Sequence, residues 1–287
     1  MKKFLLTAIL FAAAVSGSCS KDDGDNGNSP ALPSLPDPND VCSCMTNTSF
    51  IKYCYENFDL NGDGAISKTE AAAVISIGFS LSAVGDNPAP LTGIEYFPNI
   101  QEIRIYSEFL QSKVDIDLRH NKKLQYISLN LRPSGEGEIR AYIPETYEGN
   151  KRSDVGLTYC SQIYGKHASS DHRCWIVDGK LTDAASHGLT TYTIPDNVTT
   201  IGTGLFILQS LESVTIPKNV ASIESGAFSH GSRNGLTLYC KPTTPPKILS
   251  FSSTYIVQIY VPHSAVDAYK SADEWSEYAD KIEGYDF

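Results

Sequence analysis

The stretch Thr193-Ile-Pro-Asp-Asn-Val-Thr-Thr-Ile-Gly202 recurs, with six of its ten residues identical, as Thr215-Ile-Pro-Lys-Asn-Val-Ala-Ser-Ile-Glu224, at an offset of 22 positions (215 − 193). Phe206 follows the first copy and Phe228 follows the second at the same offset. A fixed period of this length is typical of solenoid proteins, in which a repeat buries its apolar side only against its neighbours. The repeat therefore predicts a stacked array of short strands.

The pattern extends in both directions along the chain. Toward the N-terminus, Ile100-Gln-Glu-Ile-Arg-Ile105 matches Leu124-Gln-Tyr-Ile-Ser-Leu129 at an offset of 24 (124 − 100), and Asn121 stands where a leucine-rich-repeat signature has asparagine. Toward the C-terminus, the strand pattern continues into Leu236-Thr-Leu238 and Val257-Gln-Ile259. Repeats therefore account for most of the chain after residue 90.

The second array resembles a known repeat family. The pattern I-P-x-x-V-x-x-I-x-x-x-x-F, which begins at Ile194 and again at Ile216, resembles the BspA-like leucine-rich repeat, and the tail resembles these proteins too. The resemblance covers residues 181–287 and departs from the family at Leu205, where alanine is usual. It implies a leucine-rich-repeat solenoid, a β-rich, right-handed superhelix of short strands. It also implies adhesion to host matrix proteins or to other cells.

The first 18 residues have the features of a lipoprotein signal peptide. Two lysines precede an apolar stretch, residues 4–15, that is too short to cross a bilayer as a helix. Small residues then lead to Cys19, the expected lipidation site, and the alternative is an ordinary secretory peptide cut near Gly17. Cys19-Ser-Lys-Asp-Asp23 resembles the surface-export signal of Bacteroidota lipoproteins, which implies lipid attachment at the outer face of the outer membrane.

A twelve-residue stretch, Asp59-Leu-Asn-Gly-Asp-Gly-Ala-Ile-Ser-Lys-Thr-Glu70, matches the EF-hand calcium loop position by position. The predicted oxygen ligands are Asp59, Asn61, Asp63, Ala65 (by its carbonyl), Ser67 and Glu70. An unpaired loop predicts one structural ion held weakly, with a Kd of about 10⁻⁴–10⁻³ M. The alternative is a helix–turn–helix that keeps the loop shape without the ion.

The flanks of this loop predict two helices. Phe50, Cys54 and Phe58 recur every four residues, as in a helix that enters the loop. Ser67 and Glu70 form a capping box for a helix that leaves it. We therefore expect a small helical cap at the N-terminal end of the repeats.

These features divide the chain into six segments. They are a signal peptide (1–18), an acidic tether rich in proline and glycine (19–40), a helical EF-hand-like cap (41–90), leucine-rich repeats (91–131), an irregular insert with a β-hairpin (132–180), and BspA-like repeats with a C-terminal capping helix (181–287). The hairpin is expected around Asp178-Gly179, and the capping helix from about His263 to Glu283. The insert departs from the repeat pattern, so we regard it as a candidate functional surface.

Cysteines after Cys19 permit disulfides in an exported chain. Cys160 and Cys174 form a possible pair within the insert. Near the N-terminal end, Cys42 or Cys44 could pair with Cys54, and the sequence leaves that choice open.

Composition and motifs limit the classes of function. With 287 residues, 41% of them hydrophobic, the chain is long and apolar enough to bury a core. Its net charge of −10 argues against a general nucleic-acid binder. The sequence contains no G-x-S-x-G, no H-E-x-x-H and no phosphate loop, so we expect no enzyme.

The candidate ligand-binding surface is one face of the C-terminal strands. Alternation along the strands places Thr193, Thr215, Thr237 and Gln258 outward as an uncharged polar ladder. The ladder suits hydrogen bonding to an extended protein or glycan, although threonine is also a common exposed strand residue. We therefore expect a cell-surface lipoprotein for protein–protein interaction or adhesion. The alternative is a glycan-binding lipoprotein that assists polysaccharide capture.

Overall fold

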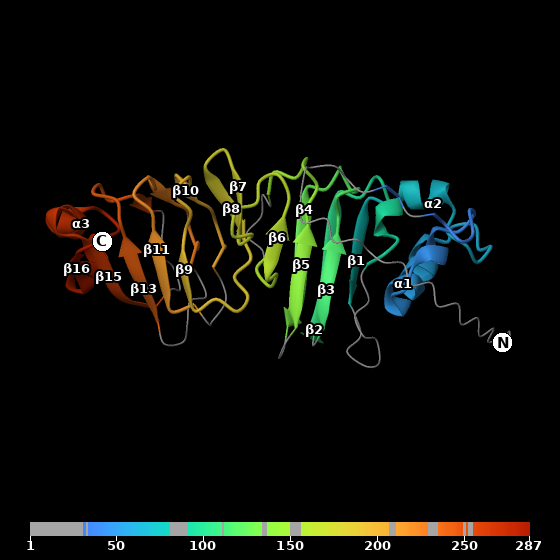
Figure 1. Cartoon of the computed structure of the whole chain (residues 1–287), viewed down its shortest axis with the longest axis horizontal. Helices are drawn as coiled ribbons and strands as arrows, with labels where there is room; N and C mark the ends of the chain where they lie inside the picture. The colour runs from blue at the N-terminus through green and yellow to red at the C-terminus, as the bar shows by residue number, and fades with distance from the viewer. Residues whose placement is uncertain are drawn as a thin grey trace.

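The computed structural model describes residues 31–32, 34–80, 91–110, 112–133, 137–149, 156–206, 211–228, 235–248, 251 and 255–287. The expected signal peptide, the lipidation site Cys19 and most of the tether lie outside these residues. The described part is an elongated stack of strands with helices at both ends (Figure 1). None of its helices is long and apolar enough to cross a membrane.

Short helices form the N-terminal end. They are η1 (Val41–Cys44), α1 (Thr48–Phe58), α2 (Lys68–Ala73) and η2 (Ile94–Tyr96). Helix α1 buries Phe50 and Cys54, as their four-residue spacing predicts. Helix α2 begins at the predicted capping box, in which Ser67 Oγ accepts from the Glu70 amide and the Glu70 carboxylate accepts from the Ser67 amide.

Two parallel three-stranded sheets form the N-terminal half of the solenoid. Sheet 1 has the order β1 (Ser76–Ser80), β2 (Glu102–Leu110) and β4 (Tyr126–Pro133), and sheet 2 has the order β3 (Lys113–Asp117), β5 (Glu138–Tyr142) and β6 (Gln162–Tyr164). Ile103 pairs with Ile127 and Ile105 with Leu129, which confirms the predicted offset of 24 (127 − 103). From β2 to β5 the chain therefore alternates between the two sheets.

Two five-stranded sheets form the C-terminal half. Sheet 3 has the order β14 (Lys247–Ile248), β12 (Ser222–Ile223), β10 (Thr200–Ile201), β8 (Lys180–Ala184) and β7 (Cys174–Val177). Sheet 4 has the order β16 (Ile282–Tyr285), β15 (Ile256–Pro262), β13 (Leu236–Cys240), β11 (Ser213–Ile216) and β9 (Thr191–Thr193). Thr193 pairs with Thr215, and the rings of Phe206 and Phe228 stack 5.5 Å apart. These contacts confirm the offset of 22 seen in the two copies.

The segment 132–180, expected as an irregular insert, is partly regular. Its strands β5 and β6 continue the parallel ladder of β3. Successive strands here lie 25 (139 − 114) and 22 (163 − 141) residues apart and share no motif. The ladder was therefore not predictable from a repeat in the sequence. The predicted hairpin is present as β7–β8, and Asp178 and Gly179 have φ of 49° and 78°, as a two-residue type I′ turn requires.

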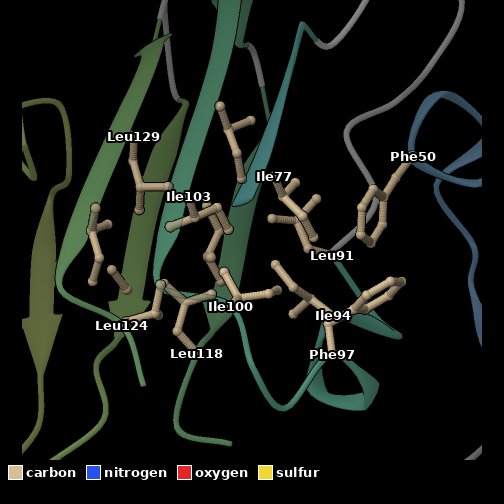
Figure 2. Close-up of a cluster of buried hydrophobic side chains, with 14 of the residues drawn as sticks. Phe50, Ile77, Leu91, Ile94, Phe97, Ile100, Ile103, Leu118, Leu124 and Leu129 are labelled. Carbon is tan, nitrogen blue, oxygen red and sulfur yellow. The ribbon is translucent and has the colours of Figure 1, made fainter. Parts of the chain in front are cut away.

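The two halves have separate hydrophobic cores. In the N-terminal core, Ile77, Ile103 and Leu129 project from neighbouring strands, and Phe50 reaches toward them from α1 (Figure 2). The C-terminal core consists of inward-facing residues of sheets 3 and 4 and of the cap behind them. Strand β7 lies between the cores: Trp175 belongs to the N-terminal core, whereas Cys174 and Ile176 belong to the other.

The C-terminal cap is helical, as predicted, but broken. It consists of η3 (His263–Ala265), α3 (Val266–Ser271) and η4 (Ser276–Lys281), followed by β16. A single helix from His263 to Glu283 does not form, because Ala272 ends α3 in extended backbone with ψ of 143°. Trp275 donates its indole N–H to the Pro246 carbonyl at 2.8 Å. This buried ring closes the end of the C-terminal core.

Candidate binding face and candidate calcium loop

The outward-facing residues of sheet 4 are uncharged from β9 to β15. The sheet register arranges them in two rows across the strands, namely Thr191, Ser213, Thr237 and Gln258, and Thr193, Thr215, Tyr239 and Tyr260. All of them are exposed or half-buried, while the strand residues that alternate with them are buried. We call these two rows the uncharged face.

The register corrects the predicted polar ladder. The sequence repeats aligned Thr215 with Thr237, but β11 and β13 pair Thr215 with Tyr239 and Ser213 with Thr237. The step between these strands is therefore 24 residues (239 − 215) rather than 22. A slip of two residues leaves every side chain on its original face, because side chains alternate with a period of two. The four predicted residues, Gln258 included, thus share the face without forming one row.

An aromatic cluster lies at the C-terminal end of the uncharged face. The rings of Tyr239 and Tyr260 stack with centroids 5.1 Å apart, and Tyr285 lies 5.3 and 5.2 Å from them. Phe287 meets the Tyr285 ring edge-on at 5.1 Å, and the Lys241 ammonium lies 6.0 Å from the Phe287 ring. Tyr285 and Phe287 are 42% and 49% exposed, so the cluster is open to a ligand.

Sequence reasoning missed this cluster. The repeat predicts Thr237 and Gln258 as outward-facing residues. Tyr239 and Tyr260 are the next outward-facing residues on the same two strands. Continuing the two-residue alternation through residues 236–240 and 258–262 would have placed a tyrosine two positions after each selected residue.

The threonine hydroxyls of the uncharged face are not used in hydrogen bonds within the described chain. The side-chain nitrogen of Gln258 also has no hydrogen-bond partner there, but it is buried and is therefore not open to a ligand. A ligand with its own donors and acceptors can thus pair with the threonine hydroxyls without breaking internal contacts.

Sheet 2 presents a different outer surface, which we call the charged face. Its outward residues are Lys113, Asp115, Asp117, Glu138, Arg140, Tyr142, Gln162 and Tyr164. Arg140 forms a bidentate pair with Asp115, with Nε–Oδ1 and Nη2–Oδ2 distances of 2.6 and 2.8 Å. Lys113 Nζ lies 3.1 Å from Glu138 Oε2. The charges of this face thus pair within the face.

The rings of the charged face are also paired. Tyr142 and Tyr164 stack with centroids 4.8 Å apart. The Arg119 guanidinium, held by Asp117, lies 5.0 Å from the Tyr142 ring, and His172 stacks on Tyr164 at 4.2 Å. The ring faces of Tyr142 and Tyr164 are therefore covered by neighbouring side chains, and mainly their ring edges remain for contact with a ligand.

The predicted calcium ligands lie in the loop between α1 and α2. Gly64 has φ of 85°, the left-handed backbone that the sharp turn at position 6 needs. Asp59 accepts amide protons from Gly62 at 2.8 Å and from Gly64 at 3.0 Å. Asn61 Oδ1 accepts from the Asp63 amide at 2.8 Å. The loop therefore curls around its own polar side chains.

Glu70 reaches this loop from α2. Its Oε1 accepts from the amides of Leu60 and Asn61 at 3.0 and 3.3 Å, and its Oε2 accepts from the Ser67 amide and hydroxyl at 2.9 and 2.8 Å. These bonds, those from Ser67 above all, hold the pKa of Glu70 below its ordinary value. The carboxylate is therefore charged at neutral pH.

The donor set fits calcium in type and order. It offers carboxylate, amide, hydroxyl and carbonyl oxygens at the loop positions that calcium uses. Within the described residues, however, no three His, Cys, Asp or Glu side chains converge as a metal site. Glu70 would have to exchange its hydrogen bonds with Leu60 and Asn61 for the ion. The oxygens fit the ion, and their present arrangement is that of an internally bonded loop.

The six described cysteines are free thiols, and the possible partners Cys160 and Cys174 lie in different cores. Cys160 lies in the N-terminal core, whereas Cys174 Sγ lies 3.2 Å from the Tyr192 hydroxyl beside the C-terminal core. Neighbouring residues of a strand point to opposite sides, so Trp175 and not Cys174 faces the core of Cys160. Burial raises the pKa of the Cys174 thiol to about 12.

Comparison with known proteins identifies the repeats. Residues 184–272 match the family model of the BspA type leucine rich repeat region, in six copies. No curated protein shows significant similarity to the chain. Among solved structures, the chain is similar to a leucine-rich repeat protein from Eubacterium ventriosum, with 15% identity, a TM-score of 0.25, and coverage of 67% of this chain and 73% of that one. From the family match and the observed strand stacking, the chain is a leucine-rich-repeat solenoid whose residues 184–272 match the BspA type.

Proposed function

We propose that the chain is a non-enzymatic cell-surface lipoprotein whose uncharged face binds a protein of the host matrix or of another cell. The observation that carries the proposal is the chemistry of the uncharged face, where hydroxyl, amide and tyrosine groups form two ordered rows on a chain of net charge −10. Lipid attachment through Cys19 at the outer membrane is proposed from the N-terminal sequence.

The composition of the uncharged face suits protein recognition. Tyrosine supplies a large, rigid contact area at low cost in conformational entropy, and small polar residues supply adaptable hydrogen bonds. Tyr239 and Tyr260 already hold each other in place, so binding restricts them little further. Charged residues are depleted at the centres of protein interfaces, and the two rows contain none.

A glycan is the second candidate ligand. Sugars stack on the open faces of aromatic rings, and Tyr239 and Tyr260 cover faces of each other's rings. The observation that favours a glycan is the exposure of Tyr285 and Phe287 at the edge of the sheet. Because these rings lie outside the two rows, we place the protein ligand first.

An array that carries matrix proteins and polysaccharides tests this choice, with the full chain and two variants as probes. The first variant, Tyr239→Ala/Tyr260→Ala, opens the stacked pair of the uncharged face. The matched control, Tyr142→Ala/Tyr164→Ala, opens the stacked pair of the charged face. Tyrosines are enriched among the residues that dominate protein interfaces, so we expect a loss of binding of about 30-fold or more. The control should bind as the wild type does.

The outcomes separate the candidates. Signals on protein spots that the first variant alone loses support the proposal. Signals confined to polysaccharide spots support glycan capture. Equal binding by both variants contradicts the assignment of the uncharged face.

We also propose that the loop Asp59–Glu70 binds one calcium ion that stabilises the N-terminal cap. Its support is the ordered set of oxygen donors, the left-handed turn at Gly64 and the two flanking helices. At 10 mM calcium and a Kd of about 1 mM, binding would add about 1.4 kcal/mol to the free energy of unfolding.

Melting curves in calcium and in chelator test this proposal. We expect calcium to raise the Tm of the wild type and of Glu56→Gln, which changes an exposed carboxylate on α1 outside the loop. Glu70→Gln should abolish the rise, because it removes the bidentate carboxylate. Superimposable curves for the wild type in both buffers would refute calcium binding.

A further inference from the structure

A buried contact outside both faces joins residues 40–44 to helix α1. We call residues 40–44 the strap. The Tyr55 hydroxyl donates to Asp40 Oδ2 at 2.6 Å, and the Cys42 thiol, together with burial, raises the pKa of the Cys54 thiol. Both cysteines belong to the N-terminal core, with 3% and 0% of their surface exposed. The strap and α1 therefore touch at Asp40 and Tyr55, and the two cysteines lie within two residues of this contact.

The strap also holds the candidate calcium loop. Asp40 Oδ1 accepts from the Ile66 amide at 3.0 Å, and the Val41 amide donates to the Ile66 carbonyl at 2.8 Å. Ile66 lies in the middle of the loop and is fully buried. Both of its backbone polar groups are therefore satisfied by the strap.

The contacts also distinguish Cys42 from its neighbour Cys44. The Cys44 thiol donates to the Val41 carbonyl at 3.3 Å and is only half-buried. The sequence left either residue open as a partner for Cys54. In the structure, Cys42 is buried in the same core as Cys54, and Cys44 does not belong to that core.

We propose that Cys42 and Cys54 form a disulfide that fastens the strap to α1 and thereby holds the backbone of the calcium loop. Cys42 and Cys54 lie within two residues of the Asp40–Tyr55 contact and are buried in the same core, so the bond would fix a contact that the strap and α1 already make. The inference rests on the proposed export of the chain, because disulfides form and persist in oxidising compartments.

The reaction is a thiol–disulfide exchange with a small disulfide such as glutathione disulfide. One cysteine, as its thiolate, attacks a sulfur of the oxidant, forms a mixed disulfide and releases one glutathione. The second cysteine attacks the mixed disulfide and releases the other glutathione. The two cysteines lose two protons and two electrons, and the oxidant takes up both as two thiols.

Burial of the two thiols determines whether the bond forms during folding or after it. The neighbouring Cys42 thiol and burial both raise the pKa of the Cys54 thiol, so little thiolate exists in the folded chain. The oxidant is also kept away from a closed core. We therefore expect the bond to form during folding, while the folded, reduced chain reacts slowly.

Refolding of the full chain in a glutathione redox buffer tests the pairing without reference to its location. After the remaining thiols are alkylated, trypsin yields peptides 22–52 and 53–68, which carry the strap cysteines and Cys54. We expect these peptides to be linked in the wild type and in Cys44→Ala, and separate in Cys42→Ala. The oxidised wild type should melt about 5–10 °C above the reduced one.

The outcomes decide between pairing and export. Linked peptides in the wild type and Cys44→Ala support the proposal even if Cys42→Ala fails to fold. A wild type that regains its folded spectrum with the two peptides separate overturns it, and so does a link that Cys44→Ala loses. A chain that is linked in the buffer but reduced in the producing cell supports the pairing and overturns the proposed export.

Discussion

Sheets 2 and 4 are both parallel and both turn one side outward, but the chemistry of their outer surfaces differs. On the charged face, Arg140 binds Asp115 in bidentate fashion and Lys113 reaches Glu138. On the uncharged face, threonines and Gln258 line the same kind of ladder without bonding to each other. One surface satisfies its polar groups internally, and the other leaves its threonine hydroxyls unbonded within the described chain.

This difference bears on the binding role that we propose for the uncharged face. A paired surface stabilises its own strands and offers little to a partner, because binding would first have to break the pairs. An unpaired, uncharged surface loses little on binding. The separate cores beneath the two surfaces allow each half of the chain to be perturbed by itself.

The largest expected effect comes from opening one core. Trp275 is 1% exposed, and its ring lies 4.8 Å from Tyr269 and 5.4 Å from Phe251. We expect Trp275→Ala to lower the free energy of unfolding by about 3–5 kcal/mol, because it leaves a cavity under the cap. Hydrogen exchange should accelerate at β11, β13 and β15 and stay unchanged at β2 and β4.

Phe97→Ala is the matched change in the other half. Phe97 is fully buried in the N-terminal core, so its removal should accelerate exchange at β2 and β4 and spare β13. Uniform acceleration across both halves, in either variant, would mean that the two cores unfold as one unit. The contrast between the halves would then apply to their surfaces alone.

Much of this fold was predictable from the sequence, because its information lies in apolar periodicity. The offset of 24 in the first array gave the register of β2 and β4, and its asparagine, Asn121, donates to the Ile94 and Phe97 carbonyls from a buried position. The turn at Asp178 and Gly179 was visible from residue type. These features depend on residue type and on spacing along the chain, and both can be read from the sequence.

The candidate site was less predictable, for a physical reason. An inward–outward pattern is unchanged when a strand slips by two residues, so the sequence could not exclude the pairing of Thr215 with Thr237. The true register places Tyr239 beside Thr215 and so reveals the aromatic cluster. Ion pairs such as Arg140 with Asp115 join residues 25 positions apart (140 − 115), and only the register of β3 and β5 brings them together.

A smaller effect tests the two faces directly through stability. Arg140 and Asp115 are 39% and 45% exposed, so solvent screens their pair, and we expect Arg140→Ala to cost about 0.5–1 kcal/mol. Thr215→Ala removes a side chain that bonds to nothing, so the change should stay within about 0.5 kcal/mol. Urea midpoints at an unchanged slope would measure both values. A larger loss for Thr215→Ala would contradict the contrast between the faces.

The smallest effect concerns acid and the N-terminal half. The hydrogen bonds from Ser67, Asn61 and Leu60 lower the pKa of Glu70 in the folded chain below its ordinary value of 4.5. The Glu70 carboxylate therefore contributes stability above about pH 4.5, and that contribution is lost as the pH falls through the lowered pKa. We expect acid to loosen α2 and the calcium loop before it affects sheet 4, as measured by amide exchange in calcium-free buffer between pH 6 and pH 3.

Glu95 gives this prediction a check of opposite sign. Burial raises the pKa of Glu95, so its protonation on acidification favours the folded state and partly offsets the loss at Glu70. Glu95→Gln should therefore make the acid loosening of α2 steeper than in the wild type, and Glu70→Gln should make it shallower. If both variants follow the wild-type profile, the acid response belongs to other groups and does not distinguish the N-terminal half from the C-terminal half.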